Sequence, residues 1–281
     1  MKSKLFVIGK PIKHSRSPII HNFWIEKYSL NASYNKLEIN QTEIKDLVQE
    51  VREDKIRGFN VTIPYKKVMI DFVDEVEESA HRSKAINTVY KAKDKVIGAN
   101  TDGIGFIASL NKDLNFHITS NTNVMCIGAG GAAYGIVSSL VECNPKIIKI
   151  INRTQSLGID LMQHFSKFVS SKTLFEVYPI GYKPDNNVDL IVNCTSCGMN
   201  GKDPLDIELG SVSKKTLVYD IVYEPCQTPL MKTADKKEIQ NTNGFFMLAR
   251  QAAESFYKWF GIMPKDSHVN EVIRILKKYN D

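Results

Sequence analysis

Short apolar runs alternate with longer stretches of helical spacing along the first hundred residues, which predicts an α/β domain. The predicted strands cover residues 4–9, 34–39 and 58–63, and the predicted helices cover 18–29, 42–53 and short turns from 66 to about 83. Residues 85–103 predict a strand and a return strand, with Lys93 and Asp94 at the hairpin turn.

The pattern changes near Asn123, where the apolar runs become almost continuous. Such runs are typical of strands in a parallel sheet that is covered on both faces. They lie within 124–131, 146–154, 188–195 and 216–223, and the first of them leads into a helix that reaches Val141. Helical spacing returns over 245–260 and 268–279.

These patterns predict a two-domain α/β protein. The 281 residues exceed the usual size of one domain, which is roughly 100–200 residues. We assign 1–103 to an N-terminal α/β domain, 104–242 to a doubly wound parallel-sheet domain, and 243–281 to C-terminal helices.

Charge and hydrophobicity argue against a nucleic-acid face and a membrane span. The net charge of +6 is spread along the chain, and no run of Lys and Arg is interleaved with aromatic residues. Residues 124–141 carry no charge over 18 positions, which is the length of a minimal span. Their glycine cluster favours a strand, a tight turn and a buried helix instead.

The cysteines indicate a reducing compartment. There are five of them, an odd number, and the first apolar run, "LFVI", is too short for a signal peptide. We therefore expect a cytoplasmic protein with reduced thiols. Cys194 and Cys197 form a CxxC without a second ligand pair, so we interpret them as small residues in a tight loop rather than as a metal site.

The stretch "GAGGAA" predicts a dinucleotide site, because it follows a strand and opens a helix. Gly128 permits the tight turn, Gly130 lets the backbone approach a pyrophosphate, and Ala133 is small enough for the helix to pack on the strand. The helix N-terminus then favours the anionic diphosphate.

The end of the following strand indicates which dinucleotide is bound. NAD-selective sites usually have an acidic residue there, whereas this chain has "NRT" at 152–154. A carboxylate would repel a 2′-phosphate, but the guanidinium of Arg153 can bind it through charge-assisted hydrogen bonds. We therefore predict NADP.

Two stretches of the N-terminal domain carry polar groups that suggest a second site. In "GKPIKHSRSP", Ser17 precedes Pro18 and is predicted to cap the following helix, while Ser15 and Ser17 together are candidates for a carboxylate receptor. In "GFNVTIPYKK", Phe59, Val61 and Ile63 alternate as in a buried strand, and the strand end then delivers Thr62 and two lysines. Such polar groups suggest that the strand ends at a site.

These motifs closely resemble those of shikimate dehydrogenase, and the likeness runs nearly from end to end. The matching segments, in chain order, are "GKPIKHSRSP", "GFNVTIPYK", "AINTV" with "GANTDG", "GAGGAA" with "NRT", "NCTSCGM", "YDIVYEPCQTPL" and "GFFMLARQAAESFYKWFG". In the fifth of these, Cys194 stands where the family commonly has alanine.

The resemblance implies an architecture and a set of site residues. The second domain is then a Rossmann NADP domain, and the C-terminal helices pack back on the first domain, beside a cleft at which the polar strand end opens. The substrate side would comprise Ser15, Ser17, Thr62, Lys66, Asn87, Asp102, Tyr223 and Gln251. The cofactor side would comprise Gly128, Ala129, Gly130, Gly131, Ala132, Asn152, Arg153, Thr154, Ile221 and Gly244.

The implied reaction is the reversible NADPH-dependent reduction of 3-dehydroshikimate to shikimate, on the pathway to chorismate and the aromatic amino acids. Lys66 and Asp102 would form its acid–base pair, with Lys67 a solvated helix residue and no metal required. Which of the pair carries the proton stays open, because coupled groups titrate jointly. So does the choice between a monomer and a homodimer.

Two alternatives remain. One is a quinate/shikimate dehydrogenase that accepts NAD; both serines together with "NRT" favour the NADP-dependent shikimate form. The other is a non-catalytic NADP-binding regulator, in which we would expect the lysine–aspartate pair to be lost.

Overall fold

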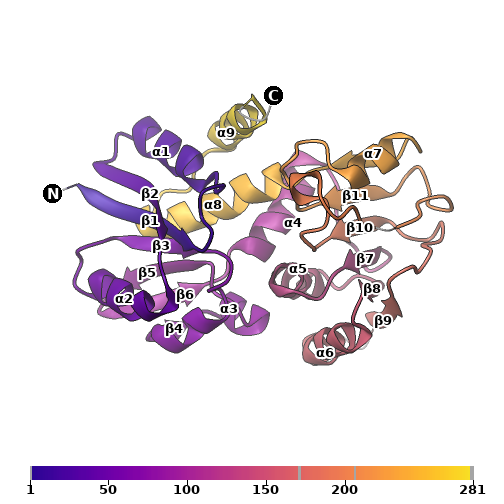
Figure 1. The fold of residues 1–281 in the computed structure, drawn as a ribbon, viewed down its shortest axis with the longest axis horizontal. Helices are drawn as coiled ribbons and strands as arrows, with labels where there is room; N and C mark the ends of the chain where they lie inside the picture. The colour runs from indigo at the N-terminus through magenta and orange to yellow at the C-terminus, as the bar shows by residue number, and fades with distance from the viewer. Residues whose placement is uncertain (1, 170–171, 206, 279–281) are drawn as a thin grey trace. The chain divides into compact units, whose positions relative to one another are not determined.

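The computed structural model describes residues 2–169, 172–205 and 207–278, which form two compact units. The first unit runs to Gly105 and resumes at Leu248, and the second comprises Phe106–Met247. Both are α/β units, and each is built around a six-stranded sheet (Figure 1).

The sheet of the first unit has the order β2-β1-β3-β5-β6-β4. β1 pairs in parallel with β2 and β3, and β5 and β6 form the antiparallel hairpin that the sequence predicts. The strands are β1 Ser3–Gly9, β2 Ala32–Glu38, β3 Gly58–Val61, β4 Glu75–Val76, β5 Thr88–Ala92 and β6 Lys95–Ala99. The helices are α1 Ser17–Lys27, α2 Ile44–Arg52, α3 Glu78–Ser83, the start of α4 Asp102–Asp113, most of α8 Phe245–Phe260, and α9 Asp266–Lys278.

The alternation along β3 separates the two faces of this sheet. Phe59 and Val61 pack with the apolar face of α2 in one core cluster. Asn60 points to the other face, where its amide donates to the Ser255 hydroxyl of α8 at 3.1 Å. The C-terminal helices therefore pack on the first unit, as the family resemblance implies, and α9 lies beside α1 (Figure 1).

The sheet of the second unit is entirely parallel, with the order β12-β11-β10-β7-β8-β9. Its strands are β7 Asn123–Ile127, β8 Ile147–Asn152, β9 Leu174–Pro179, β10 Leu190–Asn193, β11 Leu217–Asp220 and β12 Gln240–Thr242. Its helices include α5 Gly131–Glu142, α6 Gln155–Ser166 and α7 Pro229–Asp235. The predicted doubly wound sheet is confirmed.

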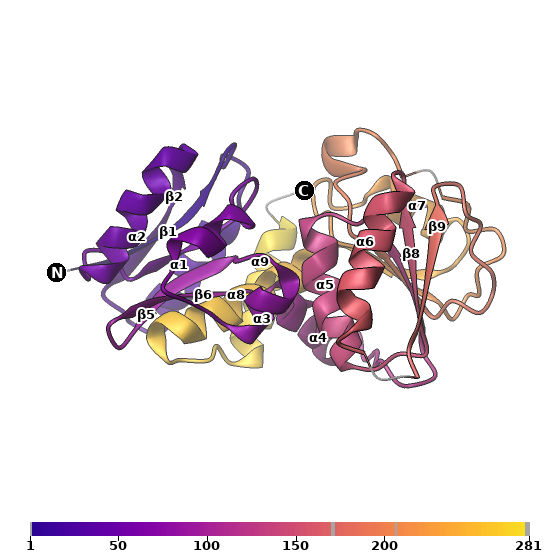
Figure 2. The same cartoon turned by 90° about the horizontal axis from the view of Figure 1, so that it is seen from below.

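The two faces of this sheet carry separate cores. α5 and α6 lie side by side on one face (Figure 2), where Ile136, Leu140 and Phe165 are fully buried. α7 packs on the other face through Leu230 and Ala234. The uncharged stretch 124–141 is thus β7, a turn and α5. Within the described parts of the chain, no helix is long and apolar enough to cross a membrane.

Between β3 and α4, three details differ from the sequence prediction. Ile63 is 67% exposed, because β3 ends at Val61 and the chain then turns, with the Tyr65 amide donating to the Thr62 carbonyl at 3.0 Å. The segment predicted as short helices contains the two-residue strand β4. A helix that the pattern does not predict, α4, begins at Asp102, although the sequence pattern places "NTDG" at the end of the hairpin.

Candidate active site

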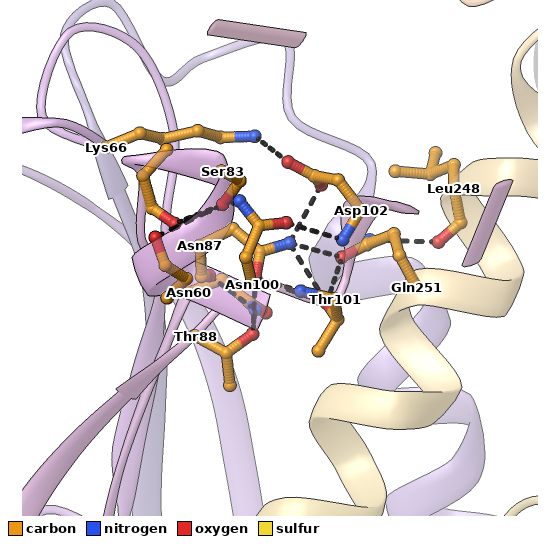
Figure 3. Close-up of polar contacts among 12 residues, drawn as sticks. Asn60, Lys66, Ser83, Asn87, Thr88, Asn100, Thr101, Asp102, Leu248 and Gln251 are labelled. Atoms are coloured by element: carbon orange, nitrogen blue, oxygen red, sulfur yellow. Dashed lines mark hydrogen bonds and ion pairs between the residues drawn. The ribbon is translucent and has the colours of Figure 1, made fainter. Parts of the chain in front are cut away.

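The ion pair between Lys66 and Asp102 is the centre of the polar group in the first unit (Figure 3). The Lys66 Nζ lies 2.7 Å from Asp102 Oδ2, and the two side chains are 23% and 10% exposed. An ammonium and a carboxylate this close and only partly solvated hold each other in one geometry. The lysine still has two N–H groups to offer to another molecule.

Asn87 forms a hydrogen bond with the second oxygen of the same carboxylate. Its amide donates to Asp102 Oδ1 at 2.8 Å and to the Thr101 hydroxyl at 3.0 Å. In return, the Thr101 backbone N–H donates to the Asn87 side-chain oxygen at 2.8 Å. Both oxygens of Asp102 therefore accept hydrogen bonds, which fixes the orientation of the carboxylate.

Gln251 joins this group from α8. Its side-chain oxygen lies 3.4 Å from the Asn87 amide and 3.3 Å from the Thr101 hydroxyl. The two helices approach closely here, since a Cβ on Gly105 of α4 would lie 2.5 Å from the Gln251 backbone nitrogen. Gln251 is buried rather than the solvated helix residue that its sequence position alone would suggest.

The segment after β3 distinguishes its two lysines. Tyr65 is buried and donates from its hydroxyl to the Ile39 carbonyl at 2.6 Å, which anchors the turn. The Lys66 carbonyl accepts from the Ile86 N–H at 2.8 Å, so the backbone of Lys66 is tied to the residue before Asn87. Lys66 is half-buried, whereas Lys67 is exposed.

Asp102 is also held through its backbone. It is the first residue of α4, where a negative charge is favoured by the helix dipole. The side chain of Asn100 accepts from the Asp102 N–H at 3.0 Å and donates to the Ala85 carbonyl at 2.9 Å (Figure 3). The start of α4 is thereby attached to the segment that carries Asn87.

The predicted capping role of Ser17 is wrong. α1 begins at Ser17 itself, Arg16 occupies the N-cap position, and no side-chain capping bond is formed there. Ser17 is instead buried, and its hydroxyl contacts the phenol of Tyr34. Ser15 is half-buried, and its hydroxyl accepts weakly from the Ser17 N–H at 3.4 Å. Thr62 is half-buried directly after β3.

A second set of buried polar residues, which sequence reasoning did not assign to the site, links Ser17 to Asn87. The Tyr34 hydroxyl donates to Asn60 Oδ1 at 2.6 Å, and the Asn60 amide donates to the Asn87 carbonyl at 3.0 Å. Ser255 contacts the Thr88 hydroxyl at 2.7 Å. Asn60 thus belongs to a buried network, not to an open strand end. The sequence feature that could have indicated this network is a polar residue, Asn60, between the buried Phe59 and Val61.

His21 is a buried imidazole beside this network. Its ring stacks on Tyr34 with centroids 4.3 Å apart and lies edge-on to Trp259 at 5.2 Å. Burial lowers the pKa of His21 to about 3, against a smaller raising effect of the Asn60 side chain. The imidazole is therefore neutral in the folded protein at ordinary pH.

This depressed pKa predicts a loss of stability in mild acid. The unfolded chain takes up a proton at His21 as the pH falls below about 6.5, whereas the folded chain does so only near 3. The contribution of His21 to the free energy of unfolding is fully present above about pH 6.5, and it falls by about 2 kcal/mol between pH 7 and pH 5. Urea unfolding should show a correspondingly smaller loss for His21→Phe. The exposed His14→Phe is the control and should keep the wild-type slope; an unchanged slope in His21→Phe would contradict this account.

In the second unit, the glycine turn has the geometry of a phosphate-binding loop. Gly128 follows β7 with φ of +105°, a conformation that favours glycine, and α5 begins at Gly131. A Cβ added to Gly130 or Gly131 would meet no atom within 4 Å, so the backbone N–H groups there can be approached closely. Ala132 is half-buried in the first turn of α5 and Ala133 is buried against the sheet. These residues fit a diphosphate.

The end of β8 presents a cation to the solvent. Arg153 is exposed, and within 2–169, 172–205 and 207–278 no side chain forms a hydrogen bond or an ion pair with it. Asn152 donates to the Thr154 carbonyl at 2.7 Å, and Thr154 occupies the N-cap position of α6. A guanidinium in this position is available for an anionic group of a ligand.

The remaining predicted residues lie at the ends of β11 and β12. A Cβ on Gly244 would lie 2.1 Å from the Ile221 carbonyl oxygen, so only glycine fits at this contact. The ring of Tyr223 is half-buried and stacks on Phe245 with centroids 5.5 Å apart. Tyr223 belongs to the second unit, unlike the other residues assigned to the substrate side.

Comparisons with known proteins show relatives over nearly the whole length of this chain. A family model described as the shikimate dehydrogenase substrate binding domain matches residues 7–89. The shikimate dehydrogenase (NADP(+)) of Pelagibacter ubique is 38% identical over 265 residues, covering 94% of this chain and 96% of the relative.

Two solved structures share the fold over nearly the whole chain. The shikimate 5-dehydrogenase of Thermus thermophilus, in complex with NADP(H) and shikimate, superposes with a TM-score of 0.86 at 28% identity, covering 98% of this chain and 99% of that one. The ligand-free 5-ketofructose reductase of a Gluconobacter species superposes with a TM-score of 0.88 at 25% identity, covering 98% of this chain and 99% of that one.

Proposed function

This chain belongs to the shikimate dehydrogenase family, and we propose that it catalyses the reversible NADPH-dependent reduction of 3-dehydroshikimate to shikimate, with Lys66 and Asp102 as the acid–base pair. As a member of this family it is an oxidoreductase that acts on a CH–OH group with NADP. The observation that carries the proposal is the ion pair of 2.7 Å between Lys66 and Asp102 within a polar group that matches the family motifs.

The chemistry requires a proton at one position. NADPH, when bound, supplies the hydride that reduces a carbonyl carbon. The carbonyl oxygen gains negative charge as the C=O bond becomes a single bond, and an N–H of Lys66 donates the proton that completes the alcohol. Asp102 keeps Lys66 Nζ in place for the transfer. In the reverse direction the pair accepts that proton.

The neighbouring residues recognise the substrate in this proposal. Asn87 and Gln251 offer amide groups to ring hydroxyls from the same group of side chains as Asp102. Ser15, Ser17 and Thr62 offer hydroxyls at the start of α1 and after β3, and the serines receive the carboxylate. Tyr223, a residue of the second unit, is assigned to the substrate by its match to the family motif. Because a site built to bind substrate hydroxyls discriminates strongly against an analogue that lacks one, these contacts set specificity.

The cofactor contacts follow from the second unit. Gly128 to Ala132 hold the diphosphate at the start of α5, and Asn152, Arg153 and Thr154 hold the adenosine end with its 2′-phosphate. Ile221 and Gly244 meet at the ends of β11 and β12, where we assign a further cofactor contact.

Arg153→Ala should therefore weaken NADP binding far more than NAD binding. Losing a hydrogen bond to a charged group costs roughly 1.5–3 kcal/mol, which is about 10- to 100-fold in affinity. Dissociation constants for both cofactors, measured by fluorescence titration, test this. Lys167→Ala removes an exposed cation next to the other end of α6 and should leave the NADP/NAD ratio unchanged. Equal losses for the two cofactors in Arg153→Ala would reduce Arg153 to a general adenosine contact.

A further inference from the structure

Asp220, the last residue of β11, is a carboxylate in the interior of the second unit that the proposed mechanism does not use. It is fully buried, and no cation among the described residues forms an ion pair with it. Burial raises the pKa of Asp220 above its ordinary value, against the lowering effect of hydrogen bonds from Thr228, Val222 and Asn193. A buried carboxylate with only neutral partners is costly, so its contacts need an explanation.

One oxygen of Asp220 links two segments. Oδ1 accepts from the Asn193 side-chain amide at 2.8 Å and from the Val222 N–H at 3.0 Å. Val222 follows Ile221, and the Val222 carbonyl accepts from the Gly244 N–H at 3.2 Å. The carboxylate therefore fixes the chain where β11 leaves the sheet next to Ile221 and Gly244.

Asn193 connects Asp220 to the loop at residues 193–197. It is fully buried at the end of β10, and its Oδ1 accepts from both the backbone N–H and the hydroxyl of Thr195, at 3.0 and 2.7 Å. The Thr195 hydroxyl in turn accepts from the Cys197 N–H at 3.0 Å. Residues 193–197 are thus folded around the Asn193 side chain.

Thr195 reaches the glycine turn. Its methyl group lies 2.7 Å from the position that a Cβ on Gly128 would occupy, so it packs directly against that residue. The Cys194 N–H donates to the Ile127 carbonyl at 2.8 Å, just before the turn. The connection Asp220–Asn193–Thr195–Gly128 therefore joins the end of β11 and the 193–197 loop to the glycine turn.

We infer that Asp220 and Asn193 are positioning residues that fix the 193–197 loop and the end of β11 relative to the glycine turn. They thereby set the affinity for the dinucleotide. The inference rests on the proposed cofactor contacts. It concerns the acceptor atom Oδ1 of Asp220 and not its charge, because the hydrogen bonds from Asn193 and Val222 both end on that oxygen, which an asparagine can also supply.

The test is the dissociation constant of NADPH, measured by fluorescence titration without substrate. Asp220→Leu keeps the branched shape of the side chain and removes its acceptor oxygens, so it should raise the dissociation constant about tenfold or more. Asp220→Asn should stay within about threefold of the wild type. Thr195→Val keeps the methyl group and removes the hydroxyl from a half-buried loop position, and should shift the constant in the same direction as Asp220→Leu even if that variant does not fold.

Thr216→Val is the matched control. Thr216 lies immediately before β11, at its opposite end, and its buried hydroxyl donates to the Val188 carbonyl at 2.6 Å. This variant should lower the melting temperature without changing the NADPH dissociation constant. The KM for shikimate at saturating NADP should be unchanged in the Asp220 and Thr195 variants, as a purely cofactor-side effect requires.

The outcomes separate this inference from the cofactor assignment. A wild-type chain that does not bind NADPH overturns the assignment and the inference together. If the wild type binds NADPH but Asp220→Leu and Thr195→Val bind it with the wild-type dissociation constant, only the inference fails. It also fails if Asp220→Asn loses as much affinity as Asp220→Leu, because the charge would then be the essential property.

Discussion

Lys66→Ala should lower kcat by at least about 100-fold, because a positioned proton donor contributes about 10²- to 10⁴-fold to such reactions. The KM for shikimate should change comparatively little, since the lost interaction develops mainly in the transition state. Steady-state kinetics of NADP reduction by shikimate measure both constants.

Lys67→Ala is the matched control for this result. The two lysines are adjacent and chemically identical, but Lys67 is exposed, whereas Lys66 pairs with Asp102 at 2.7 Å. The control should retain kcat within a few-fold. If Lys67→Ala is the inactive variant, or if Lys66→Ala keeps most of its kcat, the assignment of the acid–base pair is wrong.

Asp102→Asn should produce a loss of similar size, at least about 100-fold in kcat. Two donors face this carboxylate, the Lys66 ammonium at Oδ2 and the Asn87 amide at Oδ1. An asparagine has one acceptor oxygen, so its own NH₂ group would be directed at one of those donors. Either Lys66 would then lose its hydrogen-bond acceptor, or Asn87 would no longer hold the side chain at position 102 in its orientation.

The Lys66→Ala/Asp102→Asn double variant tests whether the residues act as one unit. Its loss in kcat should be much smaller than the product of the single losses, because either change already disables the pair. Asp71→Asn removes an exposed carboxylate from the same unit and should stay near the wild type. Independent, multiplicative losses would mean that the two residues serve separate steps.

The sequence pattern predicts most of the elements where burial follows a simple period. The parallel strands in the middle of the second sheet are apolar on both faces and were found, as was the hairpin of β5 and β6. The pattern does not predict β9, because this strand lies at the sheet edge and is only partly buried. It does not predict α4, because the first turn of this helix contains two glycines, at 103 and 105, which resemble turn residues.

The part of the site that the sequence predicts consists of residues that lie in short family motifs. Lys66, Asn87, Asp102 and Gln251, all assigned from family motifs, lie in one hydrogen-bonded group. The contact between Asn60 and Ser255 joins residues 195 positions apart, and no local pattern indicates such a pairing. The sequence predicts Ser17 as a helix cap, but its hydroxyl contacts Tyr34 across the space between α1 and β2.

The fold by itself does not identify the substrate. A 5-ketofructose reductase shares this fold with a TM-score of 0.88, although its name indicates a different ketone. Shikimate is favoured by the 38% identity to a shikimate dehydrogenase over 94% of the chain. The quinate alternative differs from it in both substrate and cofactor, so turnover of each pair separates them.

The initial rate of NADPH formation by the wild-type chain, with shikimate and NADP as the only added reactants, tests the central claim most directly. We predict rapid NADPH formation that depends on both reactants, with far slower turnover when quinate and NAD replace them. Absence of NADPH formation from shikimate, or faster turnover with quinate and NAD, would contradict the proposed function.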